Sequence, residues 1–314
     1  MSKALILAEI SRFLSSRPIC CTEEAKQQFL TDLFLAEKHS SYYDEIPTYQ
    51  ELIEKSCKKL SEETSIPLTV DYTDAEIDNP AIAYYRIKGM IMGESSWWFS
   101  TKQFNEDFQA AEANTMIMAH FIHANSGGGD TWMLDEAYQT QMKATKPIIT
   151  IVERVAASAC LYLICPSSKI YAATQNEIIG SIGTMVGFWD LDGYWESMGA
   201  KKIEYYASKS DLKNKKINDL SNGKPEQFIK DELDPLQQQY EAAFRKARPK
   251  AGELPEDHPL YRGETYATQA ATDLFVIDGQ KSFKDALNEA YQLGLTYVGK
   301  QREKNKALNF INHL

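Results

Sequence analysis

The pattern of hydrophobic and polar positions divides the chain into three parts. Residues 1–70 carry apolar positions at helical spacing between charged faces. Over residues 71–222, apolar runs rich in strand-forming residues alternate with a helical pattern, and residues 223–314 return to helical spacing. We therefore expect a helical N-terminal extension over 1–70, an α/β core over 71–222, and a helical C-terminal region over 223–314 that completes the core and forms an oligomer.

The central part predicts a sheet that is buried on both faces. Three runs have the composition of strands, namely "AIAYYRIKGMIM", "TMIMAHFIHAN" and "KPIITIVERVAA". Between the last two lies "DTWMLDEAYQTQMKAT", which has helical periodicity. Strands that alternate with helices at these lengths indicate βα units, so we expect an α/β fold with a largely parallel sheet.

Two segments outside the core allow two interpretations each. The amphipathic region 224–249 suits a helical arm that contacts a second copy, but an ordinary packed helix shows the same pattern. The stretch Pro18–Cys21 is a candidate self-cleavage region by analogy alone, and a turn between two helices is the preferred interpretation.

Composition and charge narrow the function classes. The chain has 43% hydrophobic and 25% charged residues, as in an ordinary globular protein. A net charge of −10 argues against general binding to nucleic acid or to an anionic membrane. The five cysteines are odd in number and lack zinc-ligand spacing, which favours a reducing compartment. Because no signal segment and no membrane-spanning apolar run is apparent, we expect a cytoplasmic protein.

A glycine-rich turn is the first place with possible chemistry. In "HANSGGGD" (123–130) a predicted strand runs into three glycines and then into a helix. Such a turn exposes backbone N–H groups beside a helix N-terminus, where they can bind an anion or a developing oxyanion. A tight turn with Asp130 as the helix cap would show the same pattern.

Ser158 is the second candidate. It lies in "VAASACLYLICPSSKIY" (155–171), among alanines at the junction between a predicted strand and an apolar helix. A nucleophile at a helix N-terminus is held rigidly, and the helix dipole favours the negative charge that forms after attack. The alternative is that Ser158 only caps the helix.

A nucleophilic serine needs a general base. His120 and His123 lie on one predicted strand, three positions apart, so their side chains point to opposite faces. His123 can approach the site, although a structural role is the more common one for a strand histidine. A lysine can serve when burial disfavours its charged form. The segment "EYYASKSDLKNKKIND" (204–219) offers four, and composition does not choose among them: Lys209, Lys213, Lys215 and Lys216.

The order of these pieces resembles the signal peptide peptidase A family of Ser-Lys serine peptidases, including its phage and prophage head maturation branch. The resemblance rests on "NSGGGD", "VAASACLYLICPSSKIYA", "EIIGSIGTM", the lysine segment and "RGETYATQAATDLFVIDGQKSFKDAL". It spans residues 80–290. The chain departs from the family pattern at Gly127, where the family has proline, and at Ala159 and Cys160, where it has two glycines.

This resemblance implies a role for each matching residue. Ser158 matches the nucleophile, and Lys213 matches the general base, with Lys209 as the second choice because the register there is uncertain. The backbone N–H groups of Gly128 and Ala159 would form the oxyanion hole.

The resemblance also implies a substrate cleft. Its wall would be formed by Gly180, Ser181, Ile182 and Gly183, against which an extended peptide pairs by strand addition. The side chains of Ile182 and Leu161 would shape a small apolar specificity pocket.

The function implied by the resemblance is that of a serine endopeptidase that works through an acyl-enzyme, without a metal or a cofactor. The implied fold is a crotonase/Clp-like ββα superhelix, assembled as a ring or dome of identical chains, and in several members oligomerisation completes the active site. The missing signal and membrane segments favour the phage or prophage branch, with a capsid or scaffold protein as substrate. Two alternatives stay open: a catalytically inactive scaffold of the same fold, and an acyl-coenzyme A enzyme of the crotonase type.

Overall fold

The computed structural model describes residues 19–21, 48–73, 80–95, 98–187, 192–201 and 203–312. The helical periodicity predicted across residues 1–47 therefore lies almost entirely outside the described residues. The exception is the turn predicted at Pro18–Cys21, which is wrong, because Ile19–Cys21 forms a strand, β1. Three extended residues become a strand when a partner edge is available, and a local sequence pattern does not reveal that edge.

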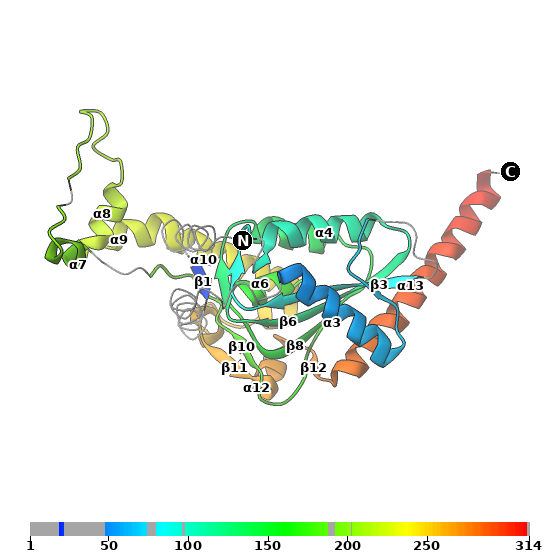
Figure 1. Cartoon of the computed structure of the whole chain (residues 1–314). Helices are drawn as coiled ribbons and strands as arrows, with labels where there is room; N and C mark the ends of the chain where they lie inside the picture. The colour runs from blue at the N-terminus through cyan, green and yellow to red at the C-terminus, as the bar shows by residue number, and fades with distance from the viewer. Residues whose placement is uncertain are drawn as a thin grey trace.

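A largely parallel sheet occupies the centre of the molecule (Figure 1). Its strands follow the order β11-β10-β8-β6-β3-β2, while β9 pairs with β8 and β12 pairs with β9. Every pair is parallel except β10 with β11, which confirms the predicted α/β class. The strands are β2 (Leu68–Thr69), β3 (Ala81–Lys88), β6 (Ile117–Ser126), β8 (Ile148–Ala157), β9 (Lys169–Ala172), β10 (Ile178–Gly180), β11 (Thr265–Ala267) and β12 (Gly279–Gln280).

Strand β8 divides its pairing between two neighbours. Residues 149–152 pair with β9, whereas residues 155–157 pair with β10. Between these two parts lies Arg154, whose φ of 75° breaks the regular strand, and the register between β6 and β8 shifts at the same level. The end of β8 is therefore directed towards β10, which brings the residue that follows it, Ser158, beside the segment after β10.

Helices cover both faces of the sheet, and each face has its own apolar core. One core joins the sheet to α3 and α13, through buried residues such as Ile53 and Leu287. The other joins it to α4, α5, α6 and α10, through residues such as Phe108 and Phe244. These helices are α3 (Tyr49–Thr64), α4 (Thr101–Ala113), α5 (Leu134–Met142), α6 (Ala159–Ile164), α10 (Asp234–Ala247) and α13 (Phe283–Asn312).

The capping chemistry of α3 shows how local sequence begins a helix. The hydroxyl of Thr48 accepts the N–H of Glu51 at 3.3 Å, and the Glu51 carboxylate accepts the N–H of Thr48 at 2.7 Å.

Although α3 and β2 fall within the predicted extension 1–70, both pack on the central sheet. In the predicted C-terminal region, β11 and β12 add strands to that sheet. The predicted division of the chain into the regions 1–70, 71–222 and 223–314 stays a prediction.

A second, smaller sheet lies at one end of the first, in the order β1-β7-β4-β5. It contains β4 (Ile91–Met92), β5 (Phe99–Ser100) and β7 (Gly128–Asp130), in addition to β1. Strand β7 follows directly on β6 of the main sheet, so the glycine turn at 126–128 joins the two sheets.

Two parts of the chain extend away from the sheets (Figure 1). One contains α7 (Asp192–Ser197), the segment 203–214, α8 (Lys215–Ser221) and α9 (Glu226–Phe228), which continues through a π-helical turn (Ile229–Leu233) into α10. The other is the C-terminal end of α13. The remaining short helices are α11 (Pro249–Gly252), α12 (Thr268–Asp273) and a 3-10 helix (Pro259–Arg262). Among the described residues, no helix is long and apolar enough to span a membrane.

Candidate active site

Ser158 occupies a strained turn between a strand and a helix. β8 ends at Ala157 and α6 begins at Ala159, and Ser158 between them has φ 56° and ψ −123°. L-residues rarely adopt this conformation, and it costs on the order of 1–3 kcal/mol. The Ser158 side chain makes no capping hydrogen bond to the helix. The interpretation of Ser158 as a simple helix cap is therefore wrong.

Hydrogen bonds from three directions hold the Ser158 backbone in this turn. Its N–H donates to the carbonyl of Gly180 at 2.9 Å. Its carbonyl accepts the Tyr162 N–H at 3.0 Å and the Tyr240 hydroxyl at 2.6 Å. The hydroxyl of Ser158 makes a long contact of 3.4 Å to the carbonyl of Gly183, and the residue is only 1% exposed. The surroundings thus fix the backbone firmly and leave the hydroxyl weakly bonded.

Burial explains the small residues beside Ser158. Ala156, Ala157 and Ala159 have no accessible surface, and all six residues of α6 are buried. The helix packs against β6, β7 and β8, so larger side chains at these alanines would displace a close-packed core.

The glycine turn contains one of the two predicted oxyanion donors. Gly128 has φ 107°, a conformation suited to glycine. Its N–H donates to the Ser126 hydroxyl at 3.1 Å, and that hydroxyl donates to the Gly89 carbonyl at 2.5 Å. The N–H of Gly128 is therefore already paired, contrary to the expectation of a free donor. The other predicted donor, the N–H of Ala159, is the first of α6 and has no acceptor within the helix.

The end of β10 and the residues that follow it lie against Ser158, through the carbonyls of Gly180 and Gly183. Gly180 has φ 136°, and a Cβ atom there would lie 2.5 Å from the Glu264 carbonyl oxygen. Ser181 also has positive φ, 55°, and its N–H donates to the same carbonyl at 2.8 Å. The close approach of Glu264 thus explains why position 180 is a glycine and why the backbone turns with positive φ at Gly180 and Ser181.

The predicted apolar specificity pocket is not formed by Ile182 and Leu161. Both side chains have no accessible surface and belong to the core on the α6 face. Leu161 points into this core because α6 is surrounded by the sheet and α10, and Ile182 packs into the same cluster. The sequence pattern identified two apolar residues near the site but not the side to which they point.

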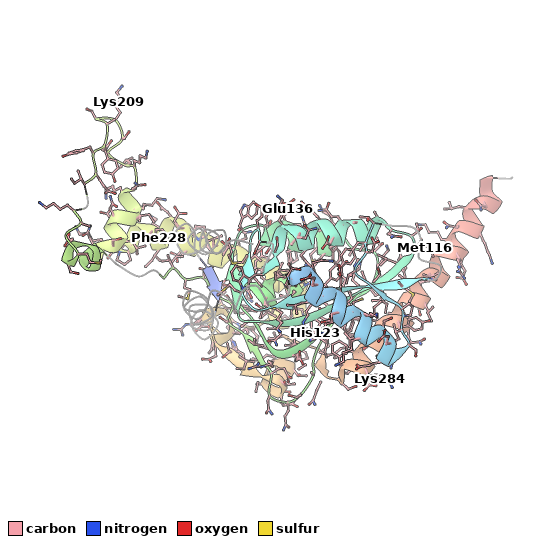
Figure 2. The ribbon with its side chains drawn as sticks, viewed as in Figure 1. Met116, His123, Glu136, Lys209, Phe228 and Lys284 are labelled. Carbon is pink, nitrogen blue, oxygen red and sulfur yellow. The ribbon has the colours of Figure 1, made fainter. Side chains whose placement is uncertain are left out.

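The lysine segment is not near Ser158 within one chain. Lys209 lies at the tip of the segment that extends from the body of the molecule (Figure 2). Lys213 is exposed and lies two residues before α8, which lies beside α9 in the same extension (Figure 1). The expected contact of Ser158 with Lys213, or with Lys209, is therefore absent from the single chain, because residues 203–214 do not fold back on the sheet.

The four lysines nevertheless differ in their partners. Lys215 pairs with Asp219, and Lys216 pairs with Glu232 and Asp231. Lys209 and Lys213 have no carboxylate partner among the residues that the structure describes. These two are the lysines that the family resemblance implies as candidate bases.

His123 has a structural role. Its Nδ1 bonds with the Tyr84 hydroxyl at 3.1 Å and its Nε2 with the Glu153 carboxylate at 2.9 Å, so both ring nitrogens are occupied. Burial lowers the pKa of His123. The ring packs against Phe283 of α13, while His120 stacks on Phe108 of α4. The two histidines thus point to opposite faces, which confirms the prediction.

Tyr240 and Ser126 support the site but were not found in the sequence. Tyr240 comes from α10 and holds the Ser158 carbonyl, and Ser126 holds the glycine turn. No local signal marks Tyr240, because its partner lies 82 positions away along the chain. For Ser126, the signal was its place immediately before the glycines.

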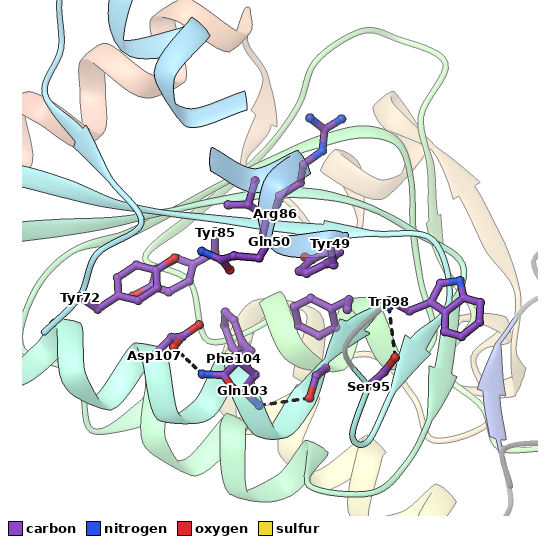
Figure 3. A pocket seen from close by; sticks show the side chains of 13 residues that line it. Tyr49, Gln50, Tyr72, Tyr85, Arg86, Ser95, Trp98, Gln103, Phe104 and Asp107 are labelled. Carbon is purple, nitrogen blue, oxygen red and sulfur yellow. Dashed lines mark hydrogen bonds between the residues drawn. The ribbon is translucent and has the colours of Figure 1, made fainter. Parts of the chain in front are cut away.

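A pocket of the described chain lies on another part of the surface, between α3 and α4 (Figure 3). It is lined by aromatic residues such as Tyr85 and Phe104, and by Arg86 and Asp107. Gln103 donates to Asp107 at 2.8 Å, and burial raises the pKa of Asp107. None of the predicted site residues lines this pocket.

Comparisons with known proteins point to one family. The family model described as peptidase family S49 matches residues 140–298, just over half of the chain. A search among curated proteins found no match.

Solved structures resemble the chain at low identity. A variant of the 1510-N membrane-bound stomatin-specific protease is 16% identical, with 68% of this chain and 86% of that chain covered and a TM-score of 0.45. A ClpP1 variant from Listeria monocytogenes is 11% identical, with 66% and 92% covered and a TM-score of 0.37. An enoyl-CoA hydratase from Shewanella pealeana ATCC 700345 is 13% identical, with 68% and 74% covered and a TM-score of 0.37.

Proposed function

Because the chain belongs to peptidase family S49, we propose that it is a serine endopeptidase in which Ser158 is the nucleophile and Lys213 is the general base. The observation that carries this proposal is the conformation of Ser158. A strained turn between a strand and a helix presents a hydroxyl at a helix N-terminus, as the nucleophile turns of other serine hydrolases do. Backbone strain of this kind is kept where the surrounding structure holds it and function requires it.

The chemistry would proceed in two steps. The amine of Lys213 takes the proton of the Ser158 hydroxyl as its oxygen attacks the carbonyl carbon of a peptide bond. The N–H groups of Ala159 and Gly128 bind the oxyanion, and for this the Gly128 N–H must exchange the Ser126 hydroxyl for the substrate oxygen. The C–N bond then breaks, the departing amine takes the proton from lysine, and water hydrolyses the acyl-enzyme.

We assign the lysine to a neighbouring copy of the chain. The segment that bears Lys213 extends from the body of the molecule and exposes large apolar side chains, which a second copy would cover. The exposed apolar residues of this part are Met198, Ile203, Tyr205, Tyr206, Leu212 and Ile217. Docking would also bury the lysine, which disfavours its charged form and makes it a base.

The substrate would be a peptide in extended conformation. β7 packs against α6, the helix that begins after Ser158, and the Gly183 carbonyl lies 3.4 Å from the Ser158 hydroxyl. An extended peptide can pair with a strand edge such as that of β7. Following the resemblance, we assign the chain to the phage or prophage branch of the family, with a capsid or scaffold protein as its substrate.

A fluorophosphonate activity probe followed by intact mass tests this proposal. Four proteins are compared: wild type, Ser158→Ala, Lys213→Ala and Lys209→Ala. We expect one label on the assembled wild type and on Lys209→Ala, and none on Ser158→Ala or Lys213→Ala. A label that persists in Ser158→Ala contradicts the nucleophile, and one that persists in Lys213→Ala contradicts the base.

The same experiment decides the second candidate function, a catalytically inactive scaffold. Two observations favour that candidate: the pairing of the Gly128 N–H with Ser126, and the absence of Lys213 from the vicinity of Ser158 in one chain. If folded and assembled wild type takes up no label and cleaves no peptide, the inactive scaffold replaces the peptidase.

A further inference from the structure

The edge of β7 is occupied by another part of the same chain. On one side β7 pairs with β4, where Gly129 lies so close that a Cβ atom would be 2.0 Å from the Ile91 carbonyl oxygen. On its other side β7 pairs with β1, antiparallel, and Cys21 lies opposite Gly128. Without β1, this side of β7 would be a free edge with unpaired N–H and C=O groups.

This edge adjoins the candidate nucleophile. β7 packs against α6, the helix that begins after Ser158. β7 also begins at Gly128, whose N–H is a proposed oxyanion donor. Peptides commonly bind proteins by adding a strand to such an edge, with main-chain hydrogen bonds supplying much of the affinity. β1 is thus bound in the way that we propose for a substrate.

The environment of Ser158 agrees with an occupied site. Ser158 and Ser126 are each 1% exposed, and Gly128 is buried. A peptide therefore cannot reach the hydroxyl until some part of the surrounding chain moves. Among the residues that the structure describes, the ladder between β1 and β7 joins three residue pairs, and a ladder of this length is short enough for competition to release it.

We infer that Ile19–Cys21 is an intramolecular inhibitor that occupies the substrate edge of β7 and keeps the site closed to other peptides until it is displaced. The inference rests on the proposed function, because it takes Ser158 as the nucleophile. It gives the N-terminal part of the chain a regulatory role. Displacement by a partner or by a substrate of higher affinity would open the site.

Proline substitutions in the full-length chain test the inference. Cys20→Pro/Cys21→Pro removes two N–H donors and disfavours strand pairing. Cys20→Ser/Cys21→Ser is the matched control, because it removes the same thiols and keeps both N–H groups. If the double proline variant does not fold, the single Cys21→Pro variant serves in its place.

Two readouts are measured on each protein. Hydrogen–deuterium exchange is followed in a peptic fragment that contains Gly128–Asp130, and the rate of fluorophosphonate labelling is followed by intact mass. We expect the proline variant to exchange faster in this fragment and to be labelled at least about tenfold faster, as expected when a competing strand is lost. The serine control should match wild type in both.

The outcomes separate the inference from the proposed function. Unchanged exchange in the proline variant overturns the inference whether or not the protein is active, since exchange needs no catalysis. Faster exchange with an unchanged rate of Ser158-dependent labelling also overturns it, because β1 then does not limit access. If no protein is labelled but the proline variant exchanges faster, the proposed function is contradicted. The exchange result would still show that β1 occupies the edge of β7.

Discussion

At the scale of single residues, the backbone of Ser158 is the feature with the clearest physical cost. Its φ of 56° and ψ of −123° suit glycine, which adopts them without a clash at Cβ. The chain keeps a serine there, held by the Tyr240 hydroxyl and by the Gly180 carbonyl. We interpret this as stability given up for a correctly placed hydroxyl.

This interpretation predicts an unusual order of stability. Ser158→Gly and Ser158→Ala both lack the hydroxyl, but only glycine relieves the backbone strain, so we expect Ser158→Gly to be more stable by about 1 kcal/mol. Urea denaturation of both variants measures the difference.

A neighbouring position supplies the control for this comparison. Ala157 lies in β8 without positive φ, so Ala157→Gly should lower the free energy of unfolding by roughly 0.5–1 kcal/mol. A Ser158→Gly variant no more stable than Ser158→Ala would show that the turn is not strained.

The sequence placed Ser158 correctly between a strand and a helix, because that junction depends on local residue types. At the glycines it was wrong: the predicted helix with Asp130 as its cap is absent, because Gly128–Asp130 pairs with other strands as β7 and α5 begins only at Leu134, after Met133. It did not identify Tyr240, whose contact with Ser158 exists only after α10 has packed on α6. It also assigned Ile182 and Leu161 to a pocket, since it shows that a residue is apolar but not which way its side chain points.

At the scale of elements, a polar network joins α4, β6 and the loop before β8, with His120 buried and Thr145 exposed. The Glu112 carboxylate accepts the His120 Nε2–H at 2.9 Å and the Thr145 N–H and hydroxyl at 2.7 Å each. Burial of His120 lowers its pKa, so the ring is neutral. A neutral ring that donates from Nε2 accepts the hydroxyl of Tyr85 at Nδ1, which also ties β3 to the network.

This network predicts a dependence of stability on pH. Burial raises the pKa of Glu112, but the hydrogen bonds from His120 and Thr145 outweigh it and lower the pKa from 4.5 to about 2. Because the folded pKa is below the unfolded one, the stabilisation is present above pH 4.5 and is lost as the pH falls towards 2. We expect Glu112→Gln to lower the free energy of unfolding by about 2 kcal/mol at pH 7.

Urea denaturation at pH 7 and at pH 3 measures this dependence. Most of the difference between wild type and Glu112→Gln should be gone at pH 3, where the unfolded chain binds the proton and the carboxylate loses its advantage. A difference that stays constant between the two pH values would contradict the lowered pKa.

The elements themselves were predictable where burial is continuous. β3, β6 and β8 follow from long apolar runs, and α5 and α10 from helical spacing. β1 and β7 were not predicted, because two or three residues become a strand only through their partners. β7 packs against α6, the helix that follows the candidate nucleophile, so the part of the fold that the sequence missed adjoins the candidate site.

At the scale of the whole molecule, the segment 203–214, which bears Lys209 and Lys213, extends away from the sheets (Figure 1). It exposes Ile203, Tyr205 and Leu212, which are 68%, 93% and 73% exposed. Side chains of this kind are normally covered in a stable protein. A ring in which each copy places this segment on its neighbour would cover them and bring Lys213 to the next Ser158.

Mixing two inactive variants tests this arrangement. Ser158→Ala and Lys213→Ala are co-expressed in equal amounts, and co-assembly is verified by native mass spectrometry. In a mixed ring, a Lys213→Ala chain keeps its Ser158, and an adjacent Ser158→Ala chain can supply the missing lysine. We expect the fluorophosphonate probe to label about half of the Lys213→Ala chains in the mixture, which is the chance of the required neighbour in a closed ring. Neither variant should be labelled alone.

The control is a mixture of Lys213→Ala with the double variant Ser158→Ala/Lys213→Ala, which assembles in the same way but contains no lysine at this position. Its chains should stay unlabelled, because no neighbour can then supply the base. If the first mixture co-assembles and its Lys213→Ala chains also stay unlabelled, the lysine acts within its own chain. The segment 203–214 would then have to fold back onto the sheet for catalysis, and the apolar side chains that it exposes would be covered by the molecule to which they belong.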